Sequence, residues 1–122
     1  VFGDKNNNRI RKINLNSTNP IFETIAGNNF FDFTNDGNLA KNSSLAFIFS
    51  IALDFQGNIY FIETTTLSSS RNYFLRFINN SNGILRTIYS SQNFTNFFSK
   101  TSISFDSNQN LYLLISFLNT LK

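Results

Sequence analysis

The 122 residues include ten basic and seven acidic side chains, for a net charge of +3, and only 14% are charged, against about 25% in ordinary soluble domains. Cys, His, Met and Trp are absent, which excludes a disulfide framework, thiolate metal sites and nucleophile–base pairs that need Cys or His. Asn is the most frequent residue, with 21 positions, followed by Phe with 16, and no apolar run has the roughly 18 residues of a membrane span.

Residues 1–45 are predicted to form the end of one four-stranded unit and the loop that leads to the next. The extended segments around residues 10–14 and 23–25 resemble residues 75–79 and 86–88 further along the chain. Both ends of the chain fall inside predicted units. We therefore expect the sequence to be a fragment of a longer protein.

Residues 46–92 are predicted to form one complete unit of four short strands, near 48–54, 58–64, 72–79 and 84–90. These segments are rich in Ile, Phe, Tyr, Leu and Thr, which favour a pleated, packed surface. Gln56-Gly57 predicts a turn between the first two strands, and Asn82-Gly83 predicts a hairpin between the last two. No 3.6-residue periodicity extends over three turns, so no long helix is expected.

Residues 93–122 are predicted to start a further unit. Residues 102–114 match residues 50–62 without a gap, at an offset of 52. Gln109 stands where the earlier copy has Gly57. Because Asn adopts the left-handed region more readily than Gln, Asn108 or Asn110 is expected to take the strained position in this turn.

The repeat and the strand composition together predict an all-β fold with four-stranded antiparallel units. The third predicted strand is apolar on both faces, from Tyr73 to Ile78, whereas a sheet with one solvated face would alternate. Each sheet is therefore expected to be covered on both sides by neighbouring sheets. Four-stranded units repeating at about 50 residues are typical of a β-propeller.

Four sequence blocks resemble the NHL-repeat family. They are Asn-Asn-Arg-Ile-Arg-Lys-Ile at 7–13, Ile-Ala-Gly at 25–27, Asn-Asp-Gly-Asn-Leu-Ala at 35–40, and Ile-Ala-Leu-Asp followed by Gly-Asn-Ile-Tyr-Phe-Ile-Glu at 51–63. The resemblance covers residues 1–63 in one register, and residues 64–122 depart further from the family pattern. It implies an NHL-like β-propeller, of which this chain would carry an incomplete ring of about two to two and a half blades.

The charged residues offer few candidates for chemistry. Arg9, Arg11 and Lys12 form the one basic cluster, which we interpret as strand residues with solvated ends, or else as a rim for phosphate, RNA or an acidic partner. Residues 32–38 resemble a calcium loop but lack the Glu at the twelfth position and flanking helices, which favours a linking turn. Asp54 and Asp106 recur at equivalent strand ends, which indicates turns. No catalytic residue, cofactor or metal site is predicted.

Four N-x-[S/T] sequons occur, at Asn16, Asn42, Asn79 and Asn93. All four are predicted to lie in loops or turns, where they could accept N-linked glycans if the chain is secreted. An alternative is that loops are simply rich in Asn and Ser. Phe-rich segments near 30–33, 47–49 and 94–98 are expected to pack between sheets, or to mark an interface if several rings face solvent.

The sequence thus predicts a non-enzymatic binding or structural scaffold, extracellular or at the cell surface, whose partner is a protein, a glycan or another copy of itself. Two alternatives stay open. The chain could belong to a propeller enzyme with its active site outside this segment, or to an RNA-binding NHL domain that uses Arg9, Arg11 and Lys12.

Overall fold

The computed structural model describes residues 1–67, 70–94 and 98–117, which form three antiparallel sheets. The first sheet contains β1 (Phe2–Asp4), β2 (Arg9–Ile13) and β3 (Phe22–Ala26); the middle sheet contains β4 (Phe47–Leu53), β5 (Ile59–Leu67), β6 (Ser70–Ile78) and β7 (Leu85–Phe94); the last contains β8 (Phe98–Phe105) and β9 (Leu111–Phe117). Two short 3-10 helices, η1 (Lys5–Asn7) and η2 (Ala40–Asn42), lie between strands. The all-β prediction is confirmed, and the strands of the middle sheet lie close to their predicted positions.

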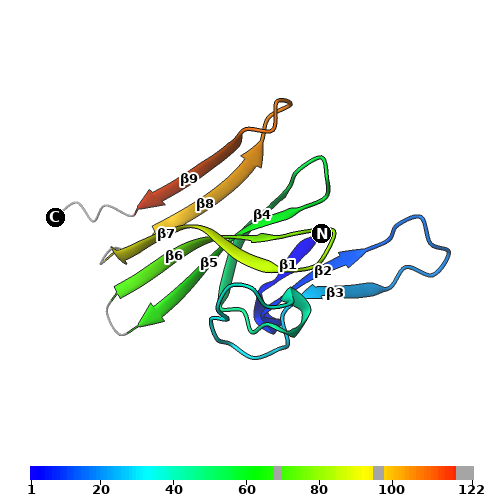
Figure 1. Ribbon diagram of the computed structural model, residues 1–122, viewed down its shortest axis with the longest axis horizontal. Helices are drawn as coiled ribbons and strands as arrows, with labels where there is room; N and C mark the ends of the chain where they lie inside the picture. Colours follow the sequence, from blue (N-terminus) through cyan, green and yellow to red (C-terminus); the bar gives the residue numbers. More distant parts are fainter. Residues whose placement is uncertain (68–69, 95–97, 118–122) are drawn as a thin grey trace.

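The first and last sheets pack on opposite faces of the middle sheet (Figure 1). Side chains alternate along β5, so that Ile59 and Phe61 join the core toward the first sheet, while Tyr60 and Ile62 join the core toward the last sheet. This arrangement explains why β5 is apolar on both faces, because each face of β5 packs against another sheet.

The first core lies between the first and middle sheets and includes residues of the connecting linker, which we define as residues 27–46. Ile10 of the first sheet, Leu45 of the linker and Phe61 of the middle sheet are fully buried in it. The linker also pairs with the start of β7, where the Gly37 amide donates to the Leu85 carbonyl at 2.9 Å. The linker is therefore part of the packed structure and covers one face of the middle sheet.

The second core joins the middle and last sheets through Ile62, Leu75 and Ile103. Two hydrogen bonds add to this contact: the Ile103 amide donates to Ser50 Oγ at 3.1 Å, and the Phe55 amide donates to Gln109 Oε1 at 2.8 Å. The face that the last sheet turns toward the middle sheet is thus equivalent to the face that the middle sheet turns toward the first sheet.

The turns follow the predicted Gly positions, with one correction. Gly57 and Gly83 have φ of 79° and 71°, which Gly adopts without a Cβ clash. In the β8–β9 turn, Gln109 itself has a positive φ of 64°, so the expectation that Asn108 or Asn110 would take this conformation is wrong. The turn geometry requires the left-handed residue at the position equivalent to Gly57, and the bond from the Phe55 amide to Gln109 Oε1 stabilises it there.

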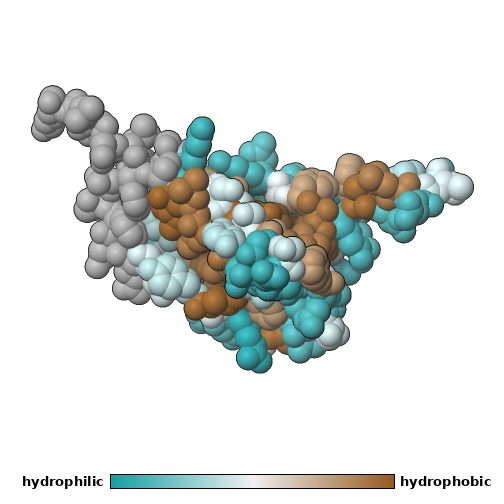
Figure 2. Space-filling view, turned by 90° about the horizontal axis from the view of Figure 1, so that it is seen from above, coloured by the Kyte–Doolittle hydropathy of each residue, from teal (hydrophilic) through white to brown (hydrophobic). Residues whose placement is uncertain are grey.

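The hairpin of β2 and β3 extends away from the other strands (Figure 1) and carries three strongly exposed apolar side chains. Leu15, Ile21 and Phe22 are 78%, 74% and 61% exposed, and the apolar surface of this hairpin is visible in Figure 2. No helix in the described part of the chain has the length and hydropathy that a bilayer crossing requires.

Candidate functional site

A buried ion pair lies at the centre of the middle sheet. Glu63 of β5 and Arg76 of β6 project from the face that is turned toward the first sheet, and both side chains are fully buried. Arg76 Nη1 donates to Glu63 Oε2 at 2.9 Å. A buried charge requires a partner because water no longer solvates it, and here the two neighbouring strands supply opposite charges.

The linker supplies further hydrogen-bond partners to both residues of this ion pair. The Ala46 amide donates to Glu63 Oε1 at 2.5 Å, and Arg76 Nη2 donates to the Thr34 carbonyl at 2.7 Å. The Phe33 ring lies on the guanidinium, with 4.3 Å from Arg76 Cζ to the ring centroid, a favourable cation–π geometry. The ion pair therefore anchors the linker to the middle sheet.

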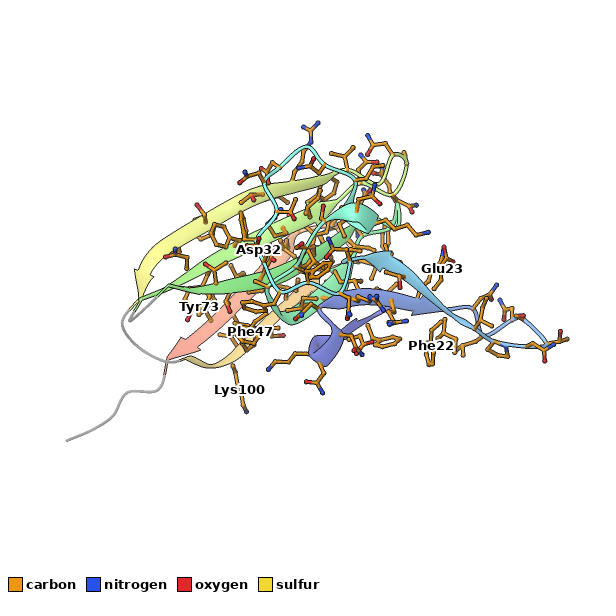
Figure 3. The ribbon with its side chains drawn as sticks, turned by 90° about the horizontal axis from the view of Figure 1, so that it is seen from below. Phe22, Glu23, Asp32, Phe47, Tyr73 and Lys100 are labelled. Carbon is orange, nitrogen blue, oxygen red and sulfur yellow. The ribbon has the colours of Figure 1, made fainter. Side chains whose placement is uncertain are left out.

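The aspartates of the predicted calcium-like loop contact the protein itself. Asp36 Oδ1 lies 3.6 Å from Arg76 Nη2 and accepts a hydrogen bond from Thr87 Oγ1 at 2.8 Å. Asp32 Oδ1 accepts from the Phe33 amide at 2.7 Å, and Figure 3 shows Asp32 in the linker over the middle sheet. Among the residues that the structure describes, no three His, Cys, Asp or Glu side chains are grouped to hold a metal ion. These contacts agree with the linking-turn interpretation.

Burial dominates the electrostatics of the pair. It raises the pKa of Glu63 from 4.5 to about 7, although the Ala46 amide and the Arg76 charge lower it in part. Burial also lowers the pKa of Arg76, an effect that the charges of Glu63 and Asp36 oppose. Desolvation disfavours the charged form of either group, so the carboxyl group of Glu63 titrates close to neutral pH.

The same pair occurs once more, in the first sheet. Arg11 Nε lies 2.9 Å from Asp4 Oδ2, and both side chains are partly exposed. In the last sheet, Ile115 occupies the position equivalent to Glu63, 52 residues further on. The acid–arginine pair is therefore a feature of the first two sheets that the last sheet lacks.

The basic cluster predicted from the sequence is largely neutralised. Arg11 pairs with Asp4, and Lys12 Nζ lies 3.2 Å from Glu23 Oε2 across the β2–β3 ladder. Arg9 lies opposite Asp4 in the register of β1 and β2. Because two of the three cations are paired with acids, this surface offers a weaker attraction for phosphate than the sequence alone indicates.

The sequons occupy different environments. Asn16 and Asn42 are exposed, in the β2–β3 loop and in η2. Asn79 begins the β6–β7 turn, where its Oδ1 accepts from the Ser81 amide at 2.8 Å. Asn93 lies in β7, so the prediction of a loop position is wrong for this sequon, and its side chain is outside the described residues.

Asp54 and Asp106 each organise a turn. Asp54 Oδ1 accepts from the amides of Gln56 and Asn58 at 3.0 and 2.9 Å, and Asp106 Oδ1 accepts from the amides of Asn108 and Asn110 at 2.9 Å each. Hydrogen bonds from Asn110 are the main reason that the pKa of Asp106 is lowered. These contacts support the prediction that both residues have a turn-forming role.

An aromatic cavity of about 370 Å³ opens beside the linker. Phe31, Phe33 and Phe74 line it together with Asp32. Phe33 and Phe74 also pack against each other, with ring centroids 4.3 Å apart. Among the rings near 30–33, Phe33 packs on the middle sheet, whereas Phe30 is 71% exposed to solvent. The side chains of the segment near 94–98 lie outside the described residues.

Sequence reasoning missed the Glu63–Arg76 pair, although a signal was present. Each residue is a charge within a predicted strand that is otherwise rich in apolar side chains. Comparison with known proteins adds no further assignment: no family model, no curated protein and no solved structure matches this chain.

Proposed function

We propose that this chain is part of an NHL-like β-propeller that acts as a non-enzymatic binding or structural scaffold. The observation that carries the proposal is that three antiparallel sheets stack one on another, each with its equivalent face turned toward the preceding sheet. Ile51 and Phe61 face the first sheet, and their equivalents Ile103 and Leu113 occupy the face of the last sheet that is turned toward the middle sheet. Successive blades of a propeller repeat in this way.

A scaffold role is supported by the faces that this stacking leaves open. Only the middle sheet has both faces covered within the described residues. The outer face of the last sheet carries Tyr112 and Leu114, each 59% exposed, which are the equivalents of Tyr60 and Ile62 in the second core. Exposed apolar faces of this kind recruit partners. In the proposal, further blades, a protein or glycan partner, or other copies of the chain cover them.

The exposed sequons support an extracellular or cell-surface setting. Asn16 and Asn42 are accessible to a glycosyltransferase, and glycans would add the solubility that a surface of low charge lacks. In this proposal the loops present contacts and no reaction takes place on the chain.

Sedimentation velocity tests the scaffold proposal. We expect the purified chain to associate as its concentration rises from low micromolar to near millimolar. Leu114→Ser should weaken this association, whereas Phe55→Ser should leave it unchanged, because Phe55 is 79% exposed but lies in the β4–β5 turn and outside either open face. A monomer at every concentration would contradict the proposal.

A further inference from the structure

The first sheet repeats the register pattern of one face of the middle sheet. Phe2 pairs with Arg11 in the register of β1 and β2, just as Phe61 pairs with Arg76 in that of β5 and β6. In both sheets the acid two residues after the phenylalanine forms an ion pair with this arginine. The two faces therefore place a phenylalanine, an acid and an arginine at equivalent register positions, and they differ beside the acid, where Arg9 stands opposite Asp4 and Phe74 opposite Glu63.

The two faces differ in what covers them. The middle-sheet residues of this face are fully buried, and their counterparts in the first sheet are partly or largely exposed. The four buried residues are Phe61, Glu63, Arg76 and Leu85, and the equivalent open residues are Phe2, Asp4, Arg11 and Phe22. We call these four open residues the outer face of the first sheet. Phe2 is 37% exposed and Phe22 is 61% exposed, and Figure 3 shows Phe22 on this sheet.

The middle sheet shows what kind of segment fits such a face. There the linker supplies an aromatic ring and a backbone carbonyl to Arg76, and a backbone amide to Glu63. Leu45 of the linker closes the core beside Phe61. All of these groups come from one contiguous segment, so a single peptide can supply the polar contacts of this face, while Ile10 and Ala26 of the first sheet complete its apolar core.

We propose that the outer face of the first sheet binds a polypeptide segment of the same kind as the linker. An aromatic ring of the bound segment would stack on the Arg11 guanidinium. The Nη atoms of Arg11 would donate to a carbonyl of the segment, because the contact of Arg11 with Asp4 is made through Nε. The Asp4 carboxylate would accept a backbone amide, and apolar side chains of the segment would cover Phe2 and Phe22, whose rings pack edge to face at 5.6 Å. This inference rests on the proposed scaffold function and names the chemistry of its partner.

A peptide with the sequence of residues 28–46, labelled with a fluorophore, tests the inference by anisotropy against the full 122-residue chain. We expect saturable binding that Arg11→Gln weakens by roughly tenfold or more, because charge-assisted hydrogen bonds are lost. Arg11→Lys should weaken it less, since Lys keeps the charge but lacks the planar fork. Arg86→Gln, which removes an exposed arginine of β7, is the matched control and should leave binding unchanged.

Two peptide controls complete the experiment. Phe33→Ala in the peptide should weaken binding, and a scrambled peptide should not bind. Binding that is unaffected by Arg11→Gln, or equal binding of the scrambled peptide, would overturn the inference, and so would the lack of saturable binding. A chain that associates in sedimentation but does not bind the peptide would refute this inference and leave the scaffold proposal standing.

Discussion

Replacing Arg76 by Met tests the importance of the buried ion pair. The substitution keeps an unbranched apolar side chain of comparable length but removes the guanidinium. It therefore deletes the hydrogen bonds to Glu63 and to the Thr34 carbonyl, and the cation on the Phe33 ring. The Glu63 carboxylate would stay buried with the Ala46 amide as a remaining donor.

The expected cost is a large part of the stability of the chain. Breaking a buried ion pair by removing one partner costs about 3–5 kcal/mol, whereas a domain is stable by about 5–15 kcal/mol in total. The cost should depend on pH, because an unpaired Glu63 can take up a proton. We expect the full loss near pH 8 and a loss of about 1–2 kcal/mol near pH 5, where protonation removes the uncompensated charge.

Urea denaturation followed by far-ultraviolet circular dichroism measures the loss, since the chain has no Trp. The double variant Glu63→Leu with Arg76→Met should lose less than Arg76→Met alone, because no unpaired charge remains. Arg86→Met is the matched control on the exposed side of β7 and should change stability by about 0.5 kcal/mol or less. An Arg76→Met variant within 1 kcal/mol of the wild type at pH 8 would refute the reasoning.

Three further predictions concern pH, turn geometry and modification. Burial raises the pKa of Glu63 to about 7. The contribution of Glu63 to stability is therefore present below about pH 4.5 and is lost as the pH rises to about 7. The melting temperature should fall over this interval, and a Glu63→Gln variant whose melting temperature falls equally steeply with pH would disprove the assignment. Gly57→Ala should lower the free energy of unfolding by about 1–2 kcal/mol, because φ is +79° and a Cβ would lie 2.9 Å from Asn80 Nδ2. Gly37→Ala, with φ of +93° and open space around the Cβ position, should lower it less. Equal losses of stability in the two variants would argue against the contact with Asn80. Expression through a secretory pathway should add a hexose ladder to the intact mass at Asn42, and a bare mass would remove this support for an extracellular setting.

The strands and turns of the middle sheet could be predicted because their signals are local. The runs of apolar residues placed β5 and β6 close to their observed bounds, and Gly57 and Gly83 marked turns that require a positive φ. The repeat at an offset of 52 added the last sheet, since β8 and β9 reproduce β4 and β5.

The candidate site was not predicted because it depends on register and on long-range packing. Glu63 and Arg76 meet because β5 and β6 pair in one register, and the pair is closed by Thr34 and Ala46 of a linker that has no regular strand of its own. The conformation of Gln109 was missed for a related reason, since its stabilising partner is the Phe55 amide in the β4–β5 turn, 54 residues away. Sequence reasoning from neighbours along the chain does not reach such contacts.

The most direct measurement of the central claim compares thiol labelling at two equivalent positions. The chain has no Cys, so Ile62→Cys and Leu114→Cys each introduce a single thiol, at sites that are 1% and 59% exposed in the wild type. We predict that dilute Leu114→Cys reacts rapidly and becomes protected as the concentration rises, while Ile62→Cys stays protected throughout. Equal labelling rates at the two positions would contradict the account, because the middle sheet would then be no better covered than the last.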